Sequence, residues 1–233
     1  MDIIIASRMN SSRLPGKALK KIHDGYSLLD VIVHRIRLSN LAGRIILATS
    51  NQSSDDPLEV WAIKNNVSIF RGELSDVLGR ISNCAKHFEL ENFVEILGDN
   101  PFVDPVHIDE CIKLFLSNKY DYVATSTTEY DFAIEEKCFP IGVRVQCIKS
   151  SIIHEASAYI KNTDEREHSS SFLYSKKSKY NRSLVEHKSR NFMDSHKLNL
   201  AVNTQGDLDR TVKIVKECGI DAPINMIIQE IYK

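Results

Sequence analysis

Near its amino terminus the chain reads Ile3-Ile4-Ile5-Ala6, a short apolar run, followed by the polar and basic segment Ser7-Arg8-Met9-Asn10-Ser11-Ser12-Arg13-Leu14-Pro15-Gly16-Lys17. A continuous apolar run of this kind is typical of a parallel strand that is buried on both faces. The segment after it is predicted to be a loop, because Pro15 and Gly16 are incompatible with a regular helix. The pattern therefore indicates a buried strand whose carboxyl end carries a basic loop.

The alternation of apolar strands with amphipathic helices continues to about residue 125. Further strands are predicted at 45–48, 67–70, 94–97 and 122–125. Helices are predicted after the N-cap Ser27, at 56–65, at 75–88 and at 104–116. Strands that alternate with helices in this way imply right-handed crossovers and helices on both faces of the sheet. We therefore expect an α/β fold with a doubly wound, mostly parallel sheet.

The alternation loosens after Ser126, and residues 127–191 are predicted to form a small inserted lobe within a single domain of residues 1–233. The lobe is expected to face the substrate or to form a dimer. Its predicted contents are a strand at 143–148, a helix from about Ser150 and a solvated Lys/Ser-rich stretch at 175–183.

The pattern of the earlier part returns after the lobe. The apolar run 198–202 predicts a strand, and a helix is expected from about Asp207. Asp221 and Pro223 indicate the start of a short terminal helix.

The composition is that of a globular protein with almost no net charge. Of the 233 residues, 42% are hydrophobic. The chain has 30 Lys and Arg residues and 31 Asp and Glu residues, which gives a net charge of −1. A nucleic-acid or anionic-membrane partner is therefore disfavoured. The five cysteines are widely spread with no C-x-x-C pair, which indicates reduced, mostly buried residues. No apolar stretch is long enough to span a membrane and no signal-peptide pattern is present, so a cytoplasmic location is expected.

Polar residues follow two of the predicted strands directly, and ligands of open parallel sheets bind at such strand ends. Arg8, Arg13 and Lys17 in the first loop could cradle a polyphosphate. Asp99, in Leu97-Gly98-Asp99-Asn100-Pro101, could hold a hard cation such as Mg²⁺. Together they point to a metal–nucleotide site, although each alone could be a solvated loop or a turn aspartate. The P-loop and G-x-G-x-x-G spacings are both missing, which disfavours a P-loop kinase and a dinucleotide oxidoreductase.

The segment from Ala6 to Lys17 resembles the A-R-x-G-S-T-R-L-P-G-K signature of the cytidylyltransferases, which include CMP-KDO synthetase and the spore-coat polysaccharide biosynthesis proteins. Later stretches resemble the spore-coat branch in the same order: Ala48-Thr49-Ser50, Asp55-Asp56-Pro57-Leu58, Phe70-Arg71-Gly72, Asp76-Val77-Leu78 with Arg80, Gly98 to Pro105, Arg166-Glu167-His168, and Val202-Asn203-Thr204 with Asp207-Leu208. The resemblance covers nearly the whole chain and implies a Rossmann-like nucleotidyltransferase fold.

The resemblance also implies an activity. A member of this family would use CTP and Mg²⁺ to convert an acidic sugar, such as KDO or a nonulosonate, into a CMP-sugar with release of pyrophosphate, for surface polysaccharide biosynthesis. Arg8, Arg13 and Lys17 would bind the triphosphate, Asp99 would hold the metal, and Lys17, Arg8 and Asp99 would form the catalytic group. A homodimer is the family-level expectation.

Other residues that the resemblance singles out have structural alternatives. Arg71, Asp76 and Arg80 are candidates for nucleotide or sugar contacts, but Asp76 could instead cap the following helix and Arg80 could be solvated. His168 could orient a sugar hydroxyl, act as a base or be structural. Asp207 is expected to cap the helix that follows it.

The chain departs from the family at positions that concern the chemistry. Asn203 stands where the family has a second metal-binding aspartate, and a neutral amide oxygen is a poorer ligand for Mg²⁺. Arg144 and Gln146 stand where acidic side chains are common, which could alter sugar recognition. Two alternatives therefore stay open: a nucleotidyltransferase that uses another nucleotide or a sugar phosphate, and a catalytically silent nucleotide-binding homologue.

Overall fold

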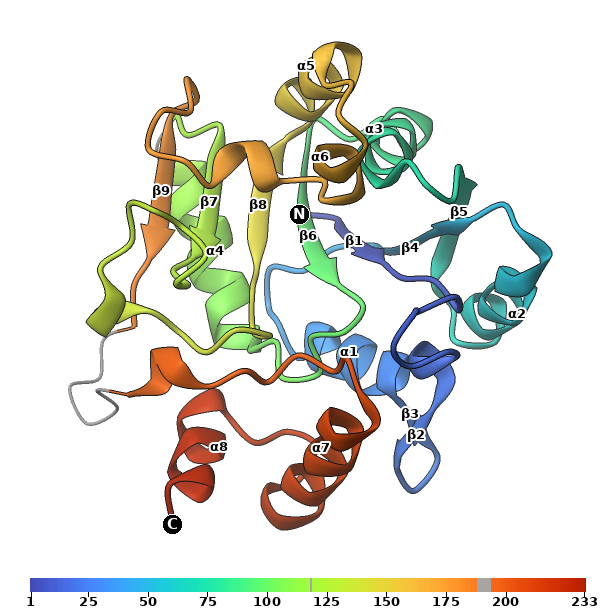
Figure 1. Cartoon of the computed structure of the whole chain (residues 1–233), viewed down its shortest axis with the longest axis vertical. Coiled ribbons are helices and arrows are strands. Elements are labelled where there is room, and N and C mark those ends of the chain that lie inside the picture. The colour runs from blue at the N-terminus through green and yellow to red at the C-terminus, as the bar shows by residue number, and fades with distance from the viewer. Residues whose placement is uncertain (118, 188–193) are drawn as a thin grey trace.

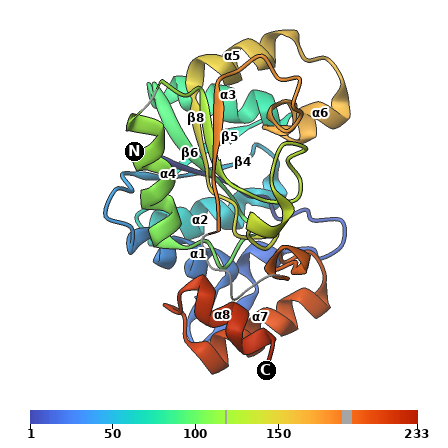
Figure 2. The same ribbon diagram turned by 90° about the vertical axis from the view of Figure 1, so that its left-hand side faces the viewer.

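A seven-stranded sheet forms the centre of the molecule, with helices on both of its faces (Figures 1 and 2). The computed structural model describes residues 1–117, 119–187 and 194–233. The strands follow the order β5 (Ser68–Gly72), β4 (Ile45–Ser50), β1 (Ile3–Ala6), β6 (Asn92–Leu97), β8 (Gln146–Lys149), β7 (Tyr122–Thr125) and β9 (Arg182–Val185). Among the described strands of this sheet, β8 alone runs antiparallel to its neighbours. The prediction of a doubly wound, mostly parallel sheet is confirmed.

Two apolar cores lie on opposite faces of the sheet. The helices are α1 (Leu28–Arg37), α2 (Asp56–Lys64), α3 (Val77–His87), α4 (Pro105–Ser117), α5 (Ser150–Tyr159), α6 (Thr163–Glu167), α7 (Gln205–Cys218) and α8 (Ile224–Ile231). Helices α1, α2, α4, α7 and α8 contribute to one core, and α3 and α5 to the other. Strand β1 contributes side chains to both cores, since Ile3 and Ile5 belong to the first and Ile4 to the second. The predicted continuous burial of this strand is confirmed.

The strand order reverses at β1, which places two loops beside each other. Strands β4 and β5 lie on one side of β1, and β6 lies on the other, with Ala6 paired to both Ala48 and Leu97. The amide of Gly98 donates to the carbonyl of Ala6 at 2.9 Å. A Cβ atom at Gly98 would lie 2.6 Å from the side chain of Ser7, so only glycine allows this close approach. The loops after β1 and β6 therefore leave the sheet side by side.

The prediction of a strand at 198–202 is wrong. The segment makes an isolated parallel bridge between Ile141 and Asn199, and its remaining residues form a connector outside the ladders. Leu200 and Val202 are buried in the core, which explains the apolar pattern. The amide of Val202 donates to the carbonyl of Asp99 at 2.9 Å, so this connector contacts the loop after β6 instead of joining the sheet.

Other element boundaries also differ from the prediction. The strand expected at 143–148 begins only at Gln146, and the amide of Val145 donates to the side-chain hydroxyl of Thr125. The end of the Lys/Ser-rich stretch 175–183 is not a solvated loop but enters β9, which pairs with β7. A small hairpin of β2 (Lys21–His23) and β3 (Tyr26–Ser27) was not predicted.

Residues 127–191 supply strands to the central sheet. Both β8 and β9 come from this segment, together with α5 and α6. Its assignment as an inserted lobe stays a prediction, and residues 188–191 lie outside the described part of the chain.

Two further features concern the composition. Each of the five cysteines is free, and four of them are buried, in agreement with the interpretation as reduced residues. In the part of the chain that the structure describes, every helix is too short or too polar to cross a lipid bilayer.

The buried carboxylate of Asp55 anchors the basic loop that follows β1. Asp55 precedes α2 and accepts hydrogen bonds from the amide of Met9 at 2.8 Å, the hydroxyl of Thr49 at 2.9 Å and the amide of Ser50 at 3.0 Å. Gly16, with φ of 71°, closes the loop by donating its amide to the carbonyl of Met9. Burial alone would raise the pKa of Asp55, but the hydrogen bonds from Ser50, Met9 and Thr49 outweigh it and lower the pKa below 3.8.

Asp55→Asn should destabilise the protein by roughly 1–3 kcal/mol at neutral pH, because an amide cannot accept all of these hydrogen bonds. The contribution of the ionised carboxylate is present above its unfolded pKa, near 3.8, and is lost as pH falls through the lower folded pKa. Urea unfolding at about pH 7 and about pH 3 should therefore show a difference that narrows in acid. Asp24→Asn, at an exposed carboxylate in the turn between β2 and β3, is the control. A difference that stays constant with pH would contradict the assignment.

Candidate active site

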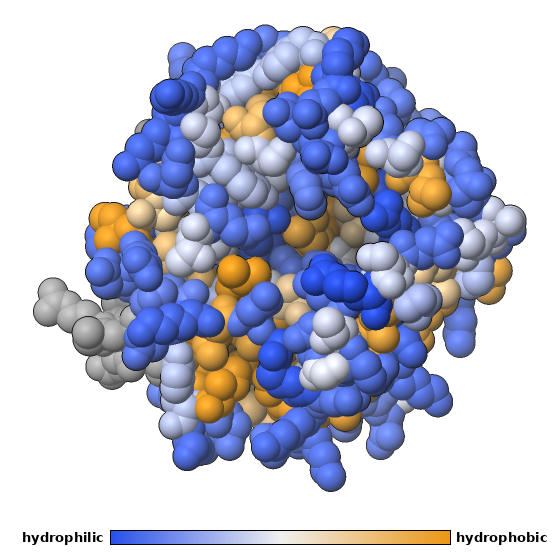
Figure 3. Space-filling view, viewed as in Figure 1, coloured by the Kyte–Doolittle hydropathy of each residue, from blue (hydrophilic) through white to orange (hydrophobic). Residues whose placement is uncertain are grey.

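A cavity of about 500 Å³ lies at the carboxyl ends of β1 and β6. Figure 3 shows a depression near the centre of this face, bordered largely by hydrophilic side chains. Its charged lining, among the described residues, consists of Arg8, Arg13, Lys17, Arg80, Arg144, Asp99, Glu129 and Glu167. Cations outnumber carboxylates in this set, so the cavity is suited to an anionic ligand.

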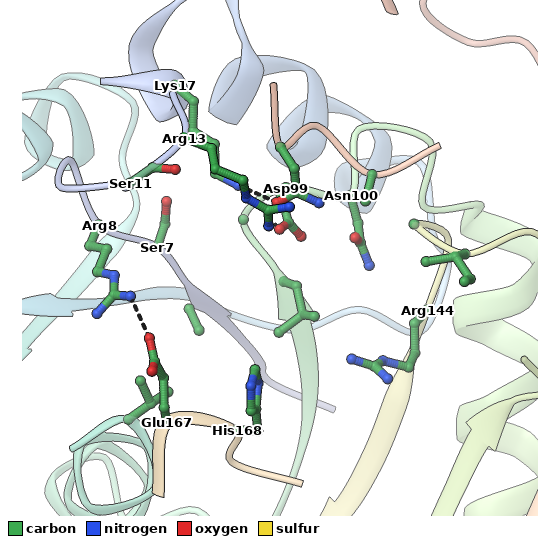
Figure 4. A pocket seen from close by; sticks show the side chains of 18 of the residues that line it. Ser7, Arg8, Ser11, Arg13, Lys17, Asp99, Asn100, Arg144, Glu167 and His168 are labelled. Atoms are coloured by element: carbon green, nitrogen blue, oxygen red, sulfur yellow. Dashed lines mark hydrogen bonds and ion pairs between the residues drawn. The ribbon is translucent and has the colours of Figure 1, made fainter. Parts of the chain in front are cut away.

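Lys17 joins the loop after β1 to two other parts of the chain. Its ammonium Nζ lies 3.2 Å from Oδ2 of Asp99 (Figure 4). The same nitrogen lies 2.8 Å from the carbonyl oxygen of Val202 and 3.3 Å from Oδ1 of Asn203. The side chains of Lys17 and Asp99 are only 14% and 24% exposed, which limits screening of their attraction by solvent. The structure thus brings the basic loop and Asp99 together, as the order of the strands suggests.

The remaining cations of the loop differ in their contacts. Nη2 of Arg8 lies 2.8 Å from Oε1 of Glu167. Glu167 is the last residue of α6, on the other side of the cavity (Figure 4). Arg13 is exposed and lines the cavity. Arg8 therefore has a carboxylate partner that a bound anion would have to compete with, whereas no described residue forms an ion pair with Arg13.

The oxygens around Lys17 suit a hard divalent cation. A carboxylate, a backbone carbonyl and an amide oxygen converge from Asp99, Val202 and Asn203. Mg²⁺ prefers oxygen ligands and is commonly held by one or two carboxylates together with substrate phosphates. No group of three or more His, Cys, Asp or Glu side chains in the described ranges could hold a metal by itself. The donor set fits a metal that is shared with a phosphate ligand.

Two of the residues singled out from the sequence lie outside the lining of the cavity. Arg71 forms ion pairs with Asp56 at 2.8 Å and Glu59 at 2.6 Å, and it holds the end of β4 against α2. Asp76 accepts from the amide of Gly79 at 2.8 Å, which makes it the N-cap of α3, and it pairs with Arg166. The capping alternative for Asp76 is therefore confirmed, and these positions give no support to a nucleotide contact by either side chain.

Arg80, His168 and Asp207 complete the set of expected residues. Arg80 lines the cavity but is only 2% exposed and donates to the carbonyl of Glu73, so the solvated alternative is wrong. His168 is exposed and points into the cavity (Figure 4). Asp207 forms a capping box with Thr204 at the start of α7, as expected.

Glu129 belongs to the site, although no pattern in the sequence predicts it. Its carboxylate lies 2.8 Å from Nη1 of Arg144, and both side chains line the cavity. Glu129 stands in an irregular segment after β7, where neither periodicity nor a motif indicates a role. Glu167 could have been predicted as a site residue from the sequence, since it lies in the Arg166-Glu167-His168 segment that resembles the family.

A buried polar network lies beside the cavity. The fully buried carboxyl group of Glu95 accepts hydrogen bonds from Nε2 of Gln146 at 3.1 Å and from the hydroxyl of Ser169. Oε1 of Gln146 in turn accepts from the hydroxyl of Tyr122. Burial raises the pKa of Glu95. Through Ser169, the network attaches the residue after His168 to Glu95 in the centre of the sheet. This attachment limits where His168 can lie.

Comparisons with known proteins agree with this geometry. The family model described as cytidylyltransferase matches residues 3–139. The spore coat polysaccharide biosynthesis protein SpsF of Bacillus subtilis is 31% identical over 166 residues, which cover 68% of this chain and 69% of SpsF. The 3-deoxy-manno-octulosonate cytidylyltransferase of Chlorobium limicola is 32% identical over 116 residues, which cover 50% of this chain and 46% of that enzyme.

A solved structure resembles the whole chain. The structure of a cytidylyltransferase from Leptospira borgpetersenii serovar Hardjo-bovis matches with a TM-score of 0.87 at 24% identity, and the match covers 99% of this chain and 92% of that one. The fold, the cation-lined cavity at the strand ends and the family match lead to one assignment. The chain belongs to the cytidylyltransferase family, and it is a nucleotidyltransferase.

Proposed function

We propose that this enzyme transfers the cytidylyl group of CTP to a hydroxyl group of an acidic sugar, with Mg²⁺ as cofactor and release of pyrophosphate. The observation that carries the proposal is the cluster of Lys17, Asp99 and Asn203 beside Arg8 and Arg13 in one cavity. The names of two relatives support the substrate class, because one acts in polysaccharide biosynthesis and the other is a 3-deoxy-manno-octulosonate cytidylyltransferase.

The charges of the cavity suit this chemistry. The sugar hydroxyl attacks the α-phosphorus, the bond to the bridging oxygen of pyrophosphate breaks, and negative charge grows on the leaving group. Arg8, Arg13 and Lys17 are fixed on one loop, and their positive charges would stabilise that leaving group. Mg²⁺, held by Asp99, Asn203 and the phosphates, would supply further charge neutralisation.

His168 faces this cation cluster from the segment after α6 (Figure 4). In the proposed reaction it orients the attacking hydroxyl or accepts its proton. Assembly as a homodimer and a cytoplasmic location stay predictions from the sequence.

Lys17→Met should reduce the rate of pyrophosphate release by about 100-fold or more, because it removes a fixed charge from the site of leaving-group stabilisation. The assay contains CTP, Mg²⁺ and 3-deoxy-manno-octulosonate, followed by other acidic sugars. Lys21→Met, at an exposed lysine of β2, is the matched control and should retain the activity. Absence of release with every acceptor, or an unaffected Lys17→Met enzyme, would contradict the proposal. Parallel reactions with UTP, GTP and ATP test the nucleotide preference.

Asn203→Asp should tighten Mg²⁺ binding severalfold in the presence of CTP, because a charged oxygen replaces a neutral one in the group of oxygens from Asp99, Val202 and Asn203. Calorimetric titration of the CTP complex with Mg²⁺ measures the change. Asn199→Asp, on the same connector, serves as the control. Unchanged or weaker affinity in Asn203→Asp would show that this position does not face the metal. Nucleotide binding without Mg²⁺ dependence or turnover would favour a catalytically silent homologue.

Glu167→Gln should tighten CTP binding by about two- to fivefold at low salt, since the pair that it forms with Arg8 is exposed and modest in strength. The substitution frees Arg8 for the phosphates. Equilibrium titration with CTP at two salt concentrations measures the gain, which should shrink at the higher one. Glu165→Gln, exposed on α6, is the control. Weaker CTP binding by Glu167→Gln would mean that Glu167 positions Arg8 instead of competing for it.

A further inference from the structure

Arg144 is placed on the side of the cavity opposite the loop after β1. It precedes β8, and Figure 4 shows its guanidinium pointing into the cavity, apart from the group formed by Lys17 and Asp99. The residue is only 8% exposed. A cation so deeply buried at the wall of a ligand cavity carries a large desolvation cost, which favours a function for its charge.

The contacts of Arg144 use only part of its hydrogen-bonding capacity. Nη1 donates to Oε2 of Glu129 at 2.8 Å, and the guanidinium lies 5.1 Å from the centre of the Tyr174 ring. Nε has no hydrogen-bond partner, and Nη2 makes no hydrogen bond with any described residue. Glu129 and Tyr174 therefore hold the guanidinium in place, and because Nε is buried, it is Nη2 that is left to donate to a further acceptor.

Arg144 and the neutral Gln146 lie two residues apart but face different surroundings. Gln146 donates to the buried Glu95 and does not line the cavity. Arg144 thus contributes to the charge that a ligand meets, whereas Gln146 contacts only the interior of the sheet.

We propose that Arg144 is a specificity-determining residue that binds the carboxylate of the acceptor sugar, and this inference rests on the proposed function. A guanidinium matches a carboxylate in shape and charge, and their hydrogen bonds are stronger than those between neutral groups. The cations near Lys17 serve the triphosphate end of the cavity, so Arg144 provides a separate positive charge for the acceptor. A neutral sugar would leave this buried charge without a second partner.

Steady-state kinetics with three acceptors test the assignment. The acceptors are 3-deoxy-manno-octulosonate, its carboxamide and a hexose 1-phosphate, which separate a carboxylate from a neutral group and from a phosphate. Arg144→Met should raise the KM for the sugar acid by about 10- to 100-fold, and leave the KM for CTP and for the carboxamide nearly unchanged. Arg144→Lys keeps the charge and should recover part of the loss. Arg37→Met, at an arginine of α1 outside the cavity lining, is the matched control.

Glu129→Gln separates recognition from structural support. Gln keeps an oxygen that can accept from Nη1 and hold the guanidinium, but it removes the negative charge. If Arg144 binds the acceptor, Glu129→Gln should therefore lower the KM for the sugar acid. If the arginine only supports Glu129, both Arg144→Met and Glu129→Gln should weaken all acceptors equally, and the proposal fails. Equal use of the sugar acid and its carboxamide by the unmodified enzyme also overturns it, as does a preference for the hexose 1-phosphate.

Failure of the proposed function gives a different result. Turnover with neutral acceptors alone would keep nucleotidyl transfer and reject the role of Arg144. If no acceptor releases pyrophosphate, calorimetric titration of 3-deoxy-manno-octulosonate into the unmodified and Arg144→Met proteins decides the question. Binding that is lost in the variant supports the carboxylate site, whereas equal or absent binding overturns it. Thermal unfolding of both proteins verifies that the variant is folded.

Discussion

The contact of the Lys17 ammonium with oxygens of Asp99, Val202 and Asn203 joins three segments that are far apart in the chain. It depends on the parallel pairing of β1 with β6, which brings the ends of both strands to one edge of the sheet. The reversal of strand order at β1 leaves this edge open to a ligand, as in other doubly wound folds. One backbone arrangement therefore determines where the charge of the site is concentrated.

Ion pairs within the cavity balance much of its charge before any ligand binds. Arg8 faces Glu167, Lys17 faces Asp99, and Arg144 faces Glu129. Such pairs keep cations oriented and reduce the cost of holding them in a partly enclosed space. The pairs differ in exposure, since Glu167 is 51% exposed and Arg144 is among the buried residues. Ligand anions can compete easily for Arg8, whereas Arg144 stays fixed in position.

Family resemblance and geometry contribute different parts of the account. The match over residues 3–139 gives the nucleotidyltransferase class and covers the segments that carry Lys17 and Asp99. It ends before Arg144 and Asn203. The possible roles of these two residues therefore follow from their contacts in the structure. Asn203 lies beside the oxygens that suit a divalent cation, and Arg144 lies in the wall of the cavity.

The sequence by itself determined β1, the basic loop after it and the cap of α1 by Ser27, because strand burial, loop formation and capping depend on neighbouring residues. It also indicated that Arg8, Lys17 and Asp99 would meet, since alternating strands and helices limit the order of the sheet. The tertiary structure decided that 198–202 is a connector, that Arg71 pairs with acids of α2, and that Glu129 reaches Arg144. Such contacts depend on how distant segments pack, and local patterns of hydrophobicity and charge do not record that packing.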